Sequence, residues 1–394
     1  MDIKNFKSGS YRRQYQYRSF TPEPINHPWI ISDASLQHLL SETDRKLGEL
    51  NAFSQLIPDV DFFIKMHIAK EATQSSRIEG TQTGMKEVLK KESDLRPEEK
   101  DDWVEVHNYI KAMSYGITEL HKLPLSNRLL KQTHQKLLQG VRGRNKMPGE
   151  FRTSQNWIGG ATLNDAAFIP PSHTEVPELM SDLEKFLNNT EIQVPHLIKI
   201  GIAHYQFETI HPFLDGNGRL GRLLITLYLV HFGILERPTL YLSDFFERNR
   251  EHYYDNLTRA RSKNDLIQWL LFFLIGVRET TINSIETFHH ILALKEECEE
   301  KKIPKLGKKT EAAKILIQHL FSKPIVHASD VAAMLKINVS TANRFINDFI
   351  KLGILKEQTG FKRNRIFIFH KYLDLFIKQK KTNSALKTKT RTTN

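Results

Sequence analysis

Apolar residues recur every three or four positions along most of the chain, a spacing that places them on one face of an α-helix. One such series is Leu36, Leu39, Leu40, Leu47 and Leu50. The spacing predicts helices over residues 33–56, 59–79, 103–120, 126–138, 178–187, 197–210, 220–230, 242–249, 252–261 and 266–295. Strand-like runs are confined to two regions, so we expect a mainly α-helical protein. Residues 1–30 are polar and punctuated by prolines, and we expect an extended arm there.

Residues 142–177 interrupt the helical pattern. Glycines and prolines flank two short β-prone pieces, residues 156–158 and 167–169. Two such pieces joined by a glycine-containing segment predict a β-hairpin. A plain surface excursion is the alternative for this segment.

The C-terminal part of the chain shows a different pattern. Helical spacing and β-prone runs follow one another over residues 310–321, 329–335, 340–352, 354–358 and 365–369. Three helices followed by a basic hairpin resemble a winged helix-turn-helix. The division that we expect is 1–100, an N-terminal region; 101–295, the main helical domain; 296–309, a charged linker; 310–376, an α+β winged-helix domain; and 377–394, a disordered basic tail.

Charge is distributed unevenly along the chain. Residues 301–394 contain 21 Lys and Arg against 5 Asp and Glu, a net charge of +16, whereas residues 1–300 contain 36 against 40, a net charge of −4. A basic end on a mildly acidic body indicates a polyanionic partner for that end. The candidate DNA contacts are Arg344, Lys362, Arg363 and Arg365. Winged helices also bind proteins or form dimers, so a protein partner and a homodimer stay open beside DNA.

The cysteine content and the hydropathy of the chain indicate the cellular compartment in which we expect the protein. Cys298 is the only cysteine, so no intrachain disulfide can form. The first 20 residues have no apolar core of signal-peptide length, and the strongest apolar run, residues 266–277, is too short to span a bilayer. We therefore expect a cytoplasmic protein with no membrane segment.

The densest cluster of chemically active side chains is the sequence HPFLDGNGRLGR at residues 211–222, between two predicted helices. Gly216 and Gly218 allow positive φ and a close approach of the backbone to a ligand. Amides at the start of the following helix favour an anion such as phosphate. An ordinary glycine-rich turn between helices is the alternative, but such a turn does not require His, Asp, Asn and two Arg together.

Each polar group of this corner suits a nucleotide polyphosphate. Asp215 is a hard oxygen ligand for Mg²⁺ bridging phosphate oxygens. Arg219 and Arg222, three residues apart, can bind phosphate oxygens from one helix face. His211 can take a proton from an incoming hydroxyl group. The corner is not a Walker A loop, because no Gly-Lys-Ser/Thr ends it.

At these residues the chain resembles the Fic (filamentation induced by cyclic AMP) family, whose active-site motif is HxFx[DE]GNGRxxR. The resemblance extends over about residues 20–290. It implies a Fic-type helical bundle that transfers AMP from ATP to a Ser, Thr or Tyr hydroxyl of a protein, including its own, and releases pyrophosphate. The implied roles are a base, His211; a Mg²⁺ ligand, Asp215; an α-phosphate contact, Asn217; an anion hole, Gly216 to Gly218; and β- and γ-phosphate contacts, Arg219 and Arg222.

The same resemblance gives meaning to two other segments. In Fic proteins a β-hairpin flap covers the active site and aligns the target segment, which here points to Ile158, Gly159 and Gly160. The pattern [ST]xxxE[GN] marks an inhibitory helix whose glutamate pairs with the last arginine of the motif. SSRIEG at residues 75–80 matches it with Ser75 and Glu79. Taken alone, these six residues would also fit an ordinary helix end.

Asn249 and Tyr253 are candidate contacts for the adenine ring, although helical aromatics are more often part of a core. Three functions are open at this point: an autoinhibited protein adenylyltransferase with ATP as substrate and Mg²⁺ as cofactor, a DNA-binding regulator with a nucleotide-sensing Fic domain, and a Fic enzyme that transfers another group or removes AMP.

Overall fold

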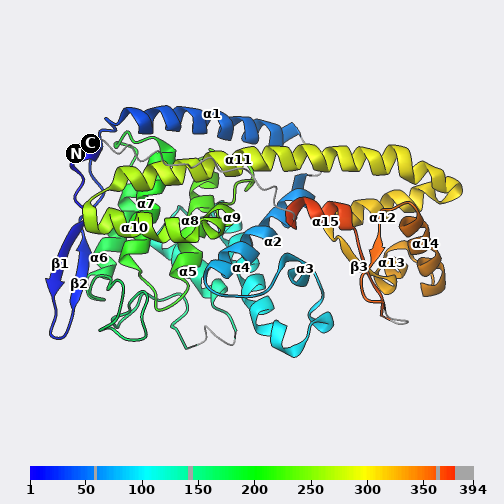
Figure 1. Cartoon of the computed structure of the whole chain (residues 1–394), viewed down its shortest axis with the longest axis horizontal. Helices are drawn as coiled ribbons and strands as arrows, with labels where there is room; N and C mark the ends of the chain where they lie inside the picture. Colours follow the sequence, from blue (N-terminus) through cyan, green and yellow to red (C-terminus); the bar gives the residue numbers. More distant parts are fainter. Residues whose placement is uncertain (57–59, 141–144, 361–363, 378–394) are drawn as a thin grey trace, which may run out of the picture. The chain divides into compact units, whose positions relative to one another are not determined.

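A computed structural model of the chain describes residues 1–56, 60–140, 145–360 and 364–377. The chain divides into two compact units, Met1–His289 and His290–Asn394. The first unit is built mainly from helices, and the second combines helices with a small sheet (Figure 1). The mainly α-helical fold that the sequence predicts is confirmed.

The helices predicted from apolar spacing in the first unit are all present, with ends within a few residues of those expected. They are α1 (Ala34–Leu56), α2 (Val60–Ile78), α4 (Lys100–Glu119), α5 (Asn127–Leu137), α6 (Val176–Asn188), α7 (His196–Ile210), α8 (Asn217–His231), α9 (Ser243–Arg248), α10 (Arg250–Lys263) and α11 (Leu266–Glu296), whose last residues belong to the second unit. The short elements α3 (Met85–Val88), η2 (Glu92–Asp94) and η3 (Pro97–Glu99) lie between α2 and α4. No helix in the described ranges combines the length and apolarity needed to cross a bilayer.

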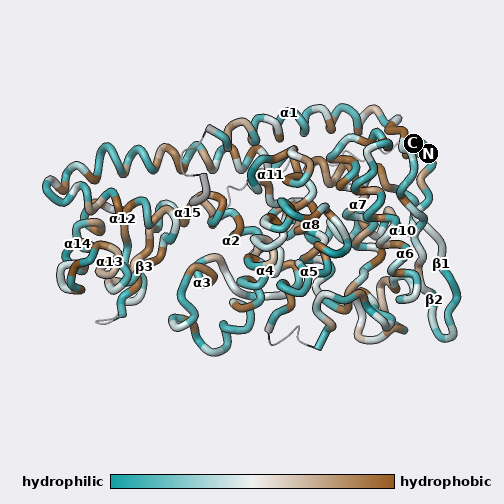
Figure 2. Tube along the Cα trace, turned by 180° about the vertical axis from the view of Figure 1, so that it is seen from behind, coloured by the Kyte–Doolittle hydropathy of each residue, from teal (hydrophilic) through white to brown (hydrophobic). Residues whose placement is uncertain are grey.

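Two adjacent helices, α7 and α8, form the centre of the first unit. Residues 197–210 of α7 are all buried, and so is nearly all of α8 up to residue 229. Both helices are therefore buried on every side, together with polar residues that include His204, Glu208 and Arg222. By contrast, polar and apolar residues alternate along the outer helix α1 (Figure 2). The loop between α7 and α8 is thus anchored at both ends in the core.

Close packing fixes α7 against α11. The indole Nε1 of Trp269 donates to the carbonyl of Gly201, at 2.9 Å. A Cβ atom at position 201 would lie 2.7 Å from Leu270, so only glycine permits this approach. On another side, α1 runs beside α11 (Figure 1), and Arg278 of α11 is 2.7 Å from Glu42 of α1.

The N-terminal residues, expected to form an extended arm, form a β-hairpin after the short helix η1 (Ile3–Asn5). Strands β1 (Gly9–Arg13) and β2 (Arg18–Pro22) pair antiparallel, from Gly9 opposite Pro22 to Arg13 opposite Arg18. The amide of Phe20 in β2 donates to the carbonyl of Ile169, at 2.9 Å. The sequence pattern missed this hairpin because its turn contains no glycine or proline.

The hairpin predicted within residues 142–177 is present in minimal form. Ile158 and Phe168 exchange both main-chain hydrogen bonds, at 2.9 and 3.1 Å. Gly159 and Gly160 have φ values of 70° and 72° and begin the connecting turn. The carboxylate of Asp165 then accepts the amide of Ala161, at 3.0 Å, so the turn amides bind this side chain instead of extending the ladder.

The second unit contains the three helices and the following pair of strands that the sequence pattern predicts. Its elements are η4 (Glu297–Lys302), η5 (Ile303–Lys309), α12 (Thr310–Ser322), β3 (Ile325–His327), α13 (Ala328–Leu335), α14 (Val339–Lys351), β4 (Lys356–Glu357), β5 (Ile366–Ile368) and α15 (His370–Ile377). The strands form one antiparallel sheet in the order β3-β5-β4. The segment expected to form a linker is helical, and the sequence pattern missed β3 and α15.

Candidate active site

The motif begins at the point where α7 ends. His211 adopts a left-handed conformation, φ 50° and ψ 61°, and its amide donates to the carbonyl of Phe207, at 2.9 Å. Gly216, with φ 75°, then directs the chain into α8. A non-glycine residue in this region of φ/ψ space is uncommon and costs free energy that its surroundings must supply.

A buried arginine that sequence reasoning missed supplies part of that support. The Arg152 guanidinium donates to the carbonyls of His211 (3.0 Å), Pro171 (2.6 Å), Ile210 (3.3 Å) and Ser154 (3.3 Å). Arg152 is 2% exposed, and burial lowers the pKa of its guanidinium to about 10. No sequence signal distinguishes this arginine, because its partners are main-chain atoms from three separate segments.

Amide side chains hold the inner part of the loop. The Asn217 Oδ1 accepts the amide of Phe213 and its Nδ2 donates to the carbonyl of the same residue, both at 2.8 Å. Asn156 Nδ2 donates to the carbonyls of Phe213 (2.9 Å) and His211 (3.2 Å). Because the Asn217 side chain is engaged within the loop, the α-phosphate contact implied for it stays a prediction.

The loop also rests on His134, which was not predicted to contribute. Its ring stacks on Phe213 with a centroid distance of 3.8 Å. Nδ1 accepts the amide of Gly149 and Nε2 is 2.9 Å from the carbonyl of Asp215, so the proton is on Nε2. Burial lowers the pKa of His134 to about 4, which keeps the ring neutral in this arrangement.

The imidazole of His211 is suited to accept a proton. Its side chain is 19% exposed, and its Nδ1 lies 4.0 Å from Glu208 Oε2. Burial, with the nearby Arg261 guanidinium, lowers the pKa of His211 to about 4. The ring is therefore neutral near pH 7, as a general base must be.

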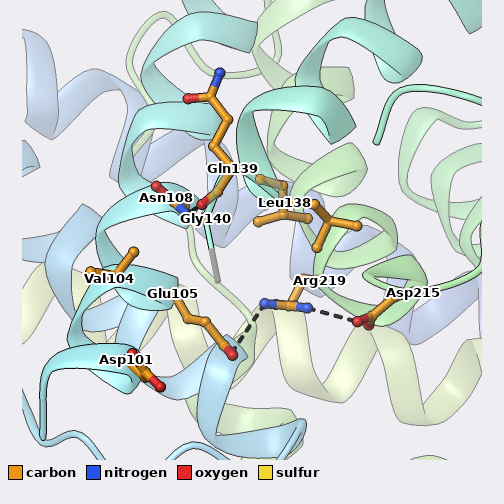
Figure 3. A pocket seen from close by; sticks show the side chains of 10 residues that line it. Asp101, Val104, Glu105, Asn108, Leu138, Gln139, Gly140, Asp215 and Arg219 are labelled. Carbon is orange, nitrogen blue, oxygen red and sulfur yellow. Dashed lines mark hydrogen bonds and ion pairs between the residues drawn. The ribbon is translucent and has the colours of Figure 1, made fainter. Parts of the chain in front are cut away.

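Asp215 and Arg219 line a cleft beside the loop (Figure 3). Asp215 Oδ1 accepts the amide of Gly216, at 2.6 Å, and lies 3.4 Å from Arg219 Nη2. Arg219 Nη1 lies 3.4 Å from Glu105 Oε2, so the guanidinium bridges two carboxylates. The remaining lining residues come mainly from α4 and the end of α5: Asp101, Val104, Asn108, Leu137, Leu138, Gln139 and Gly140.

A magnesium ion bound with a nucleotide fits these residues. Among the residues that the structure describes, no three His, Cys, Asp or Glu side chains come together to form a metal cage. The Asp215 side chain is 41% exposed. Magnesium in nucleotide sites is usually held by one or two carboxylates together with substrate phosphates, so one accessible carboxylate is enough.

Arg222 is bound to the end of α2. Its Nε donates to Ser75 Oγ at 2.9 Å, and its Nη2 donates to the Ser75 carbonyl at 2.9 Å and to Glu79 Oε1 at 2.6 Å. The Arg222 side chain is 1% exposed and that of Glu79 is 35% exposed. Burial alone would raise the pKa of Glu79, but the Arg222 guanidinium holds it below its ordinary value.

The Glu79 carboxylate also lies against the loop itself. A Cβ atom at position 218 would overlap Glu79 Oε1 and lie 3.0 Å from Arg222 Nη1. A larger residue at position 218 would require the Glu79 carboxylate to shift from its present contact with Arg222. The carboxylate thus lies against the backbone of Gly218 in the first turn of α8.

A buried carboxyl group anchors the helix that carries Ser75. Glu71 of α2 accepts the hydroxyl of Tyr109 (3.0 Å), the hydroxyl of Ser243 (2.5 Å) and the amide of Ser243 (3.1 Å). Burial raises the pKa of Glu71. These contacts tie α2 to α4 and α9, so the position of the Glu79–Arg222 pair is fixed by tertiary structure.

The two candidate adenine contacts differ in accessibility. Tyr253 is 1% exposed, and its hydroxyl bonds to His204 Nε2 at 2.9 Å, so its ring belongs to the core. Asn249 Nδ2 donates to the carbonyl of Phe245, at 2.9 Å. The neighbouring Tyr254 is 39% exposed. The adenine role of Asn249 and Tyr253 stays a prediction.

The candidate DNA contacts belong to the second unit. Arg344 is exposed on α14, with Nη2 3.4 Å from Thr341 Oγ1. Arg365 Nη2 donates to Asn343 Oδ1 at 3.0 Å. Lys362 and Arg363 lie outside the described residues.

Comparison with known proteins agrees with the geometry of the corner. Residues 124–229 match the model of the Fic/DOC family, and residues 37–118 match that of the Fic/DOC family N-terminal region. The chain therefore contains both segments of the Fic/DOC family. The Fic match contains the whole corner at residues 211–222, and the N-terminal match contains Ser75 and Glu79. Asn249, Tyr253 and the second unit lie beyond both matches.

Curated relatives of this Fic chain share part of its length. It is 33% identical over 136 residues to the protein adenylyltransferase Fic of Aedes aegypti, and 32% identical over 136 residues to that of Drosophila erecta. Each alignment covers 34% of this chain and 24% of the relative. The chain thus spans about a quarter of the length of these relatives.

Solved Fic structures share the fold. A Fic family protein from Desulfovibrio desulfuricans G20 aligns with a TM-score of 0.56 at 21% identity, covering 87% of this chain and 98% of that one. A Fic domain containing signaling protein from Bacteroides thetaiotaomicron VPI-5482 aligns with a TM-score of 0.50 at 17% identity, covering 64% and 96%.

Proposed function

We propose that this Fic chain is a protein adenylyltransferase that Glu79 holds in an inhibited state. The observation that carries the proposal is the position of the Glu79 carboxylate, 2.6 Å from Arg222 and against the backbone of Gly218. A carboxylate in that position mimics the terminal phosphate of a nucleotide bound to the loop. The similarity to relatives that are named protein adenylyltransferases supports the reaction class.

The proposed reaction begins at His211. Its neutral Nε2 takes the proton of a Ser, Thr or Tyr hydroxyl on the target protein. The hydroxyl oxygen forms a bond to the α-phosphorus of ATP while the bond from that phosphorus to the bridging oxygen breaks, and pyrophosphate leaves. Mg²⁺ held by Asp215 would neutralise charge on the phosphates.

The remaining motif residues orient the nucleotide. Backbone amides from Gly216 to Gly218 face the start of α8, where the helix dipole favours phosphate. Arg219 and Arg222 provide guanidinium groups for the β- and γ-phosphates. Asn217 keeps the loop in shape through its bonds to Phe213 and presents its own backbone to the α-phosphate.

Glu79 would inhibit by taking the Arg222 site. With the carboxylate in place, the γ-phosphate meets a like charge and loses its guanidinium partner. ATP then binds with its α-phosphate turned away from the attacking hydroxyl. A displacement of about 1 Å at a reacting centre can cost about 10²-fold in rate, so one ion pair suffices as a switch.

The hairpin would position the target segment. Ile158, Gly159 and Gly160 lie where the chain turns, and a target segment would add to this edge as an extra strand. Gly159 and Gly160 have positive φ, which turns their peptide groups away from the ladder between Ile158 and Phe168.

Mass spectrometry of the protein after incubation with ATP and Mg²⁺ tests the reaction. We expect Glu79→Gly protein to gain an AMP group on itself or on an acceptor from a lysate, and Glu79→Gly/His211→Ala protein to gain none. A gain of phosphate instead would assign another transferred group. Loss of AMP from a modified acceptor would assign removal of AMP instead. The absence of any gain would favour the nucleotide-sensing regulator.

DNA binding by the second unit is a separate proposal. Exposed Arg344 on α14 and the net charge of +16 over residues 301–394 support it. Basic side chains on this helix would contact phosphates, and the released counterions would make binding sensitive to salt. A protein partner or a homodimer is the alternative for the same unit.

A further inference from the structure

Glu208 is a buried carboxyl group that the reaction above does not use. It lies in the last turn of α7, three residues before His211, and its Oε2 is 4.0 Å from His211 Nδ1. Over the described part of the chain, neither His211 Nδ1 nor Glu208 Oε1 has a hydrogen-bond partner of ordinary geometry, although the main-chain carbonyl of Glu208 lies near enough to the imidazole to act on its pKa. Unpaired buried polar atoms are rare in proteins and costly, so this pair requires an explanation.

A glycine on the neighbouring helix leaves space for the Glu208 side chain. A Cβ atom at position 221 would overlap Glu208 Oε1, so the glycine of α8 is what admits the carboxyl group. The charged and titratable groups that face Glu208 are Arg222 of α8, Glu79 after α2, Arg261, Tyr253 and Tyr254 of α10, and His211. Burial raises the pKa of Glu208 to about 7, while Arg222 and Arg261 oppose that rise.

We propose that Glu208 is a positioning residue for His211, accepting a hydrogen bond from Nδ1–H so that the lone pair of Nε2 faces the target hydroxyl. A small rotation of either side chain shortens the present 4.0 Å separation to a hydrogen bond. A base that must accept a proton at Nε2 needs its other nitrogen protonated, and that N–H needs a buried acceptor. Glu208 offers a carboxyl oxygen at this distance. Its effect on the rate rests on the proposed function, but its effect on the imidazole does not.

The ionised form of Glu208 has a second effect. When Nε2 takes the hydroxyl proton, the ring becomes a cation, and a carboxylate beside Nδ1 stabilises that cation. Transfer should therefore increase with pH as Glu208 ionises, at a pH below 7 in the Glu79→Gly protein, because the Glu79 carboxylate contributes to the raised pKa of Glu208. His211, with its pKa of about 4, is already neutral over this range and adds no further step.

If Glu208 had a purely structural role, Glu208→Gln should lower the stability of the protein. The raised pKa of Glu208 predicts the reverse at pH 8. The folded-state pKa of Glu208 is raised from 4.5 to about 7, so this group contributes stability below pH 4.5 that is lost as pH rises through 7. At pH 8 the protein holds a buried ionised carboxylate, and Arg222 and Arg261 offset only part of the cost of burying that charge. Glu208→Gln relieves that cost and should leave the melting temperature at pH 8 equal or higher.

The experiment compares Glu208→Gln and Glu208→Ala in the Glu79→Gly protein. Histidine ¹⁵N NMR, with the His211 signals assigned from their absence in His211→Ala, reports which ring nitrogen is protonated. We expect Nδ1–H in the parent and in Glu208→Gln, whose amide oxygen also accepts, and a mixture of tautomers in Glu208→Ala. Glu71→Gln removes another buried carboxyl group of raised pKa and should leave the His211 signals unchanged.

Transfer rates complete the test. Glu208→Gln should lower kcat by about 10-fold, less than the ~10²–10⁴-fold that the general base itself contributes, with KM for ATP unchanged. It should also remove the rise in rate that accompanies ionisation of Glu208. An unchanged tautomer in Glu208→Ala, or an unchanged kcat in both variants, would overturn the proposal. If no variant transfers AMP, the adenylyltransferase proposal fails and the NMR result alone decides the role of Glu208.

Discussion

Replacement of Glu79 by glycine is the most direct perturbation of the proposed switch. It removes the 2.6 Å ion pair with Arg222 and clears the space above Gly218. The Arg222 guanidinium keeps its two bonds to Ser75, so it stays in place for a phosphate. We expect AMP transfer, including self-modification, to increase by at least an order of magnitude.

The expected size of the increase in AMP transfer follows from the electrostatics of the site. Two like charges about 4 Å apart interact by about 4 kcal/mol at an effective dielectric constant of about 20, which corresponds to about 10³-fold in rate. The Glu79 side chain is 35% exposed, so solvent screening reduces this value. An increase of about 10- to 10²-fold is the result consistent with both facts.

The assay measures incorporation of AMP from α-labelled ATP with ATP and Mg²⁺ saturating. Glu79→Gln is the matched control, because it keeps the size of the side chain and removes its charge, and we expect an intermediate increase. Glu79→Gly/Arg222→Ala should be inactive, because the phosphate contact itself is missing.

The same substitution should lower stability modestly. After this substitution the buried Arg222 cation has only the neutral Ser75 as a partner. Because the lost partner, Glu79, is partly exposed, we expect a decrease of about 1–2 kcal/mol in the free energy of unfolding. A Glu79→Gly protein no more active than wild type on any acceptor would refute the inhibition and leave residues 75–80 as an ordinary helix end.

Three further results are expected. His211→Ala in the Glu79→Gly protein should lower transfer by ~10²–10⁴-fold while calorimetry shows unchanged ATP binding; a retained rate would contradict the assigned base. Arg152→Lys should lower the free energy of unfolding by about 2–4 kcal/mol, because an ammonium cannot reach four carbonyls and leaves some unpaired; an unchanged denaturation midpoint would contradict this. The full chain should shift duplex DNA in gels at low salt but not at high salt, and Arg344→Ala should weaken the shift; no shift at low salt would favour the protein-contact alternative.

Local sequence determined the helical elements and the residues of the corner. Apolar spacing located the helices of the first unit because a helix repeats every 3.6 residues, and that period is visible without tertiary information. Gly216 and Gly218 were recognisable because positive φ and close approach restrict the residue type. The pieces that pair at Ile158 and Phe168 were identified because short β-prone runs flanked by glycine and proline are also visible in the local sequence.

Other features depended on residues far apart in the sequence. The N-terminal hairpin, strand β3 and helix α15 are short, and their residues gain stability from packing against the rest of the fold. Arg152 and His134 support the corner through main-chain atoms of distant segments, and no side-chain pattern records such contacts. The hydrogen bond from the Tyr253 hydroxyl to buried His204 is another long-range contact that no local pattern indicates.

The sequence by itself determined which groups this protein has for chemistry, and the tertiary structure decided which of them meet. Glu79 and Arg222 are 143 residues apart, and they touch because Glu71 fixes α2 to α4 and α9 while glycine at position 218 leaves space for the carboxylate. Glu208 faces His211 because the chain turns left-handed at the end of α7 and glycine at position 221 admits its side chain. Both arrangements depend on long-range packing, which local periodicity does not encode.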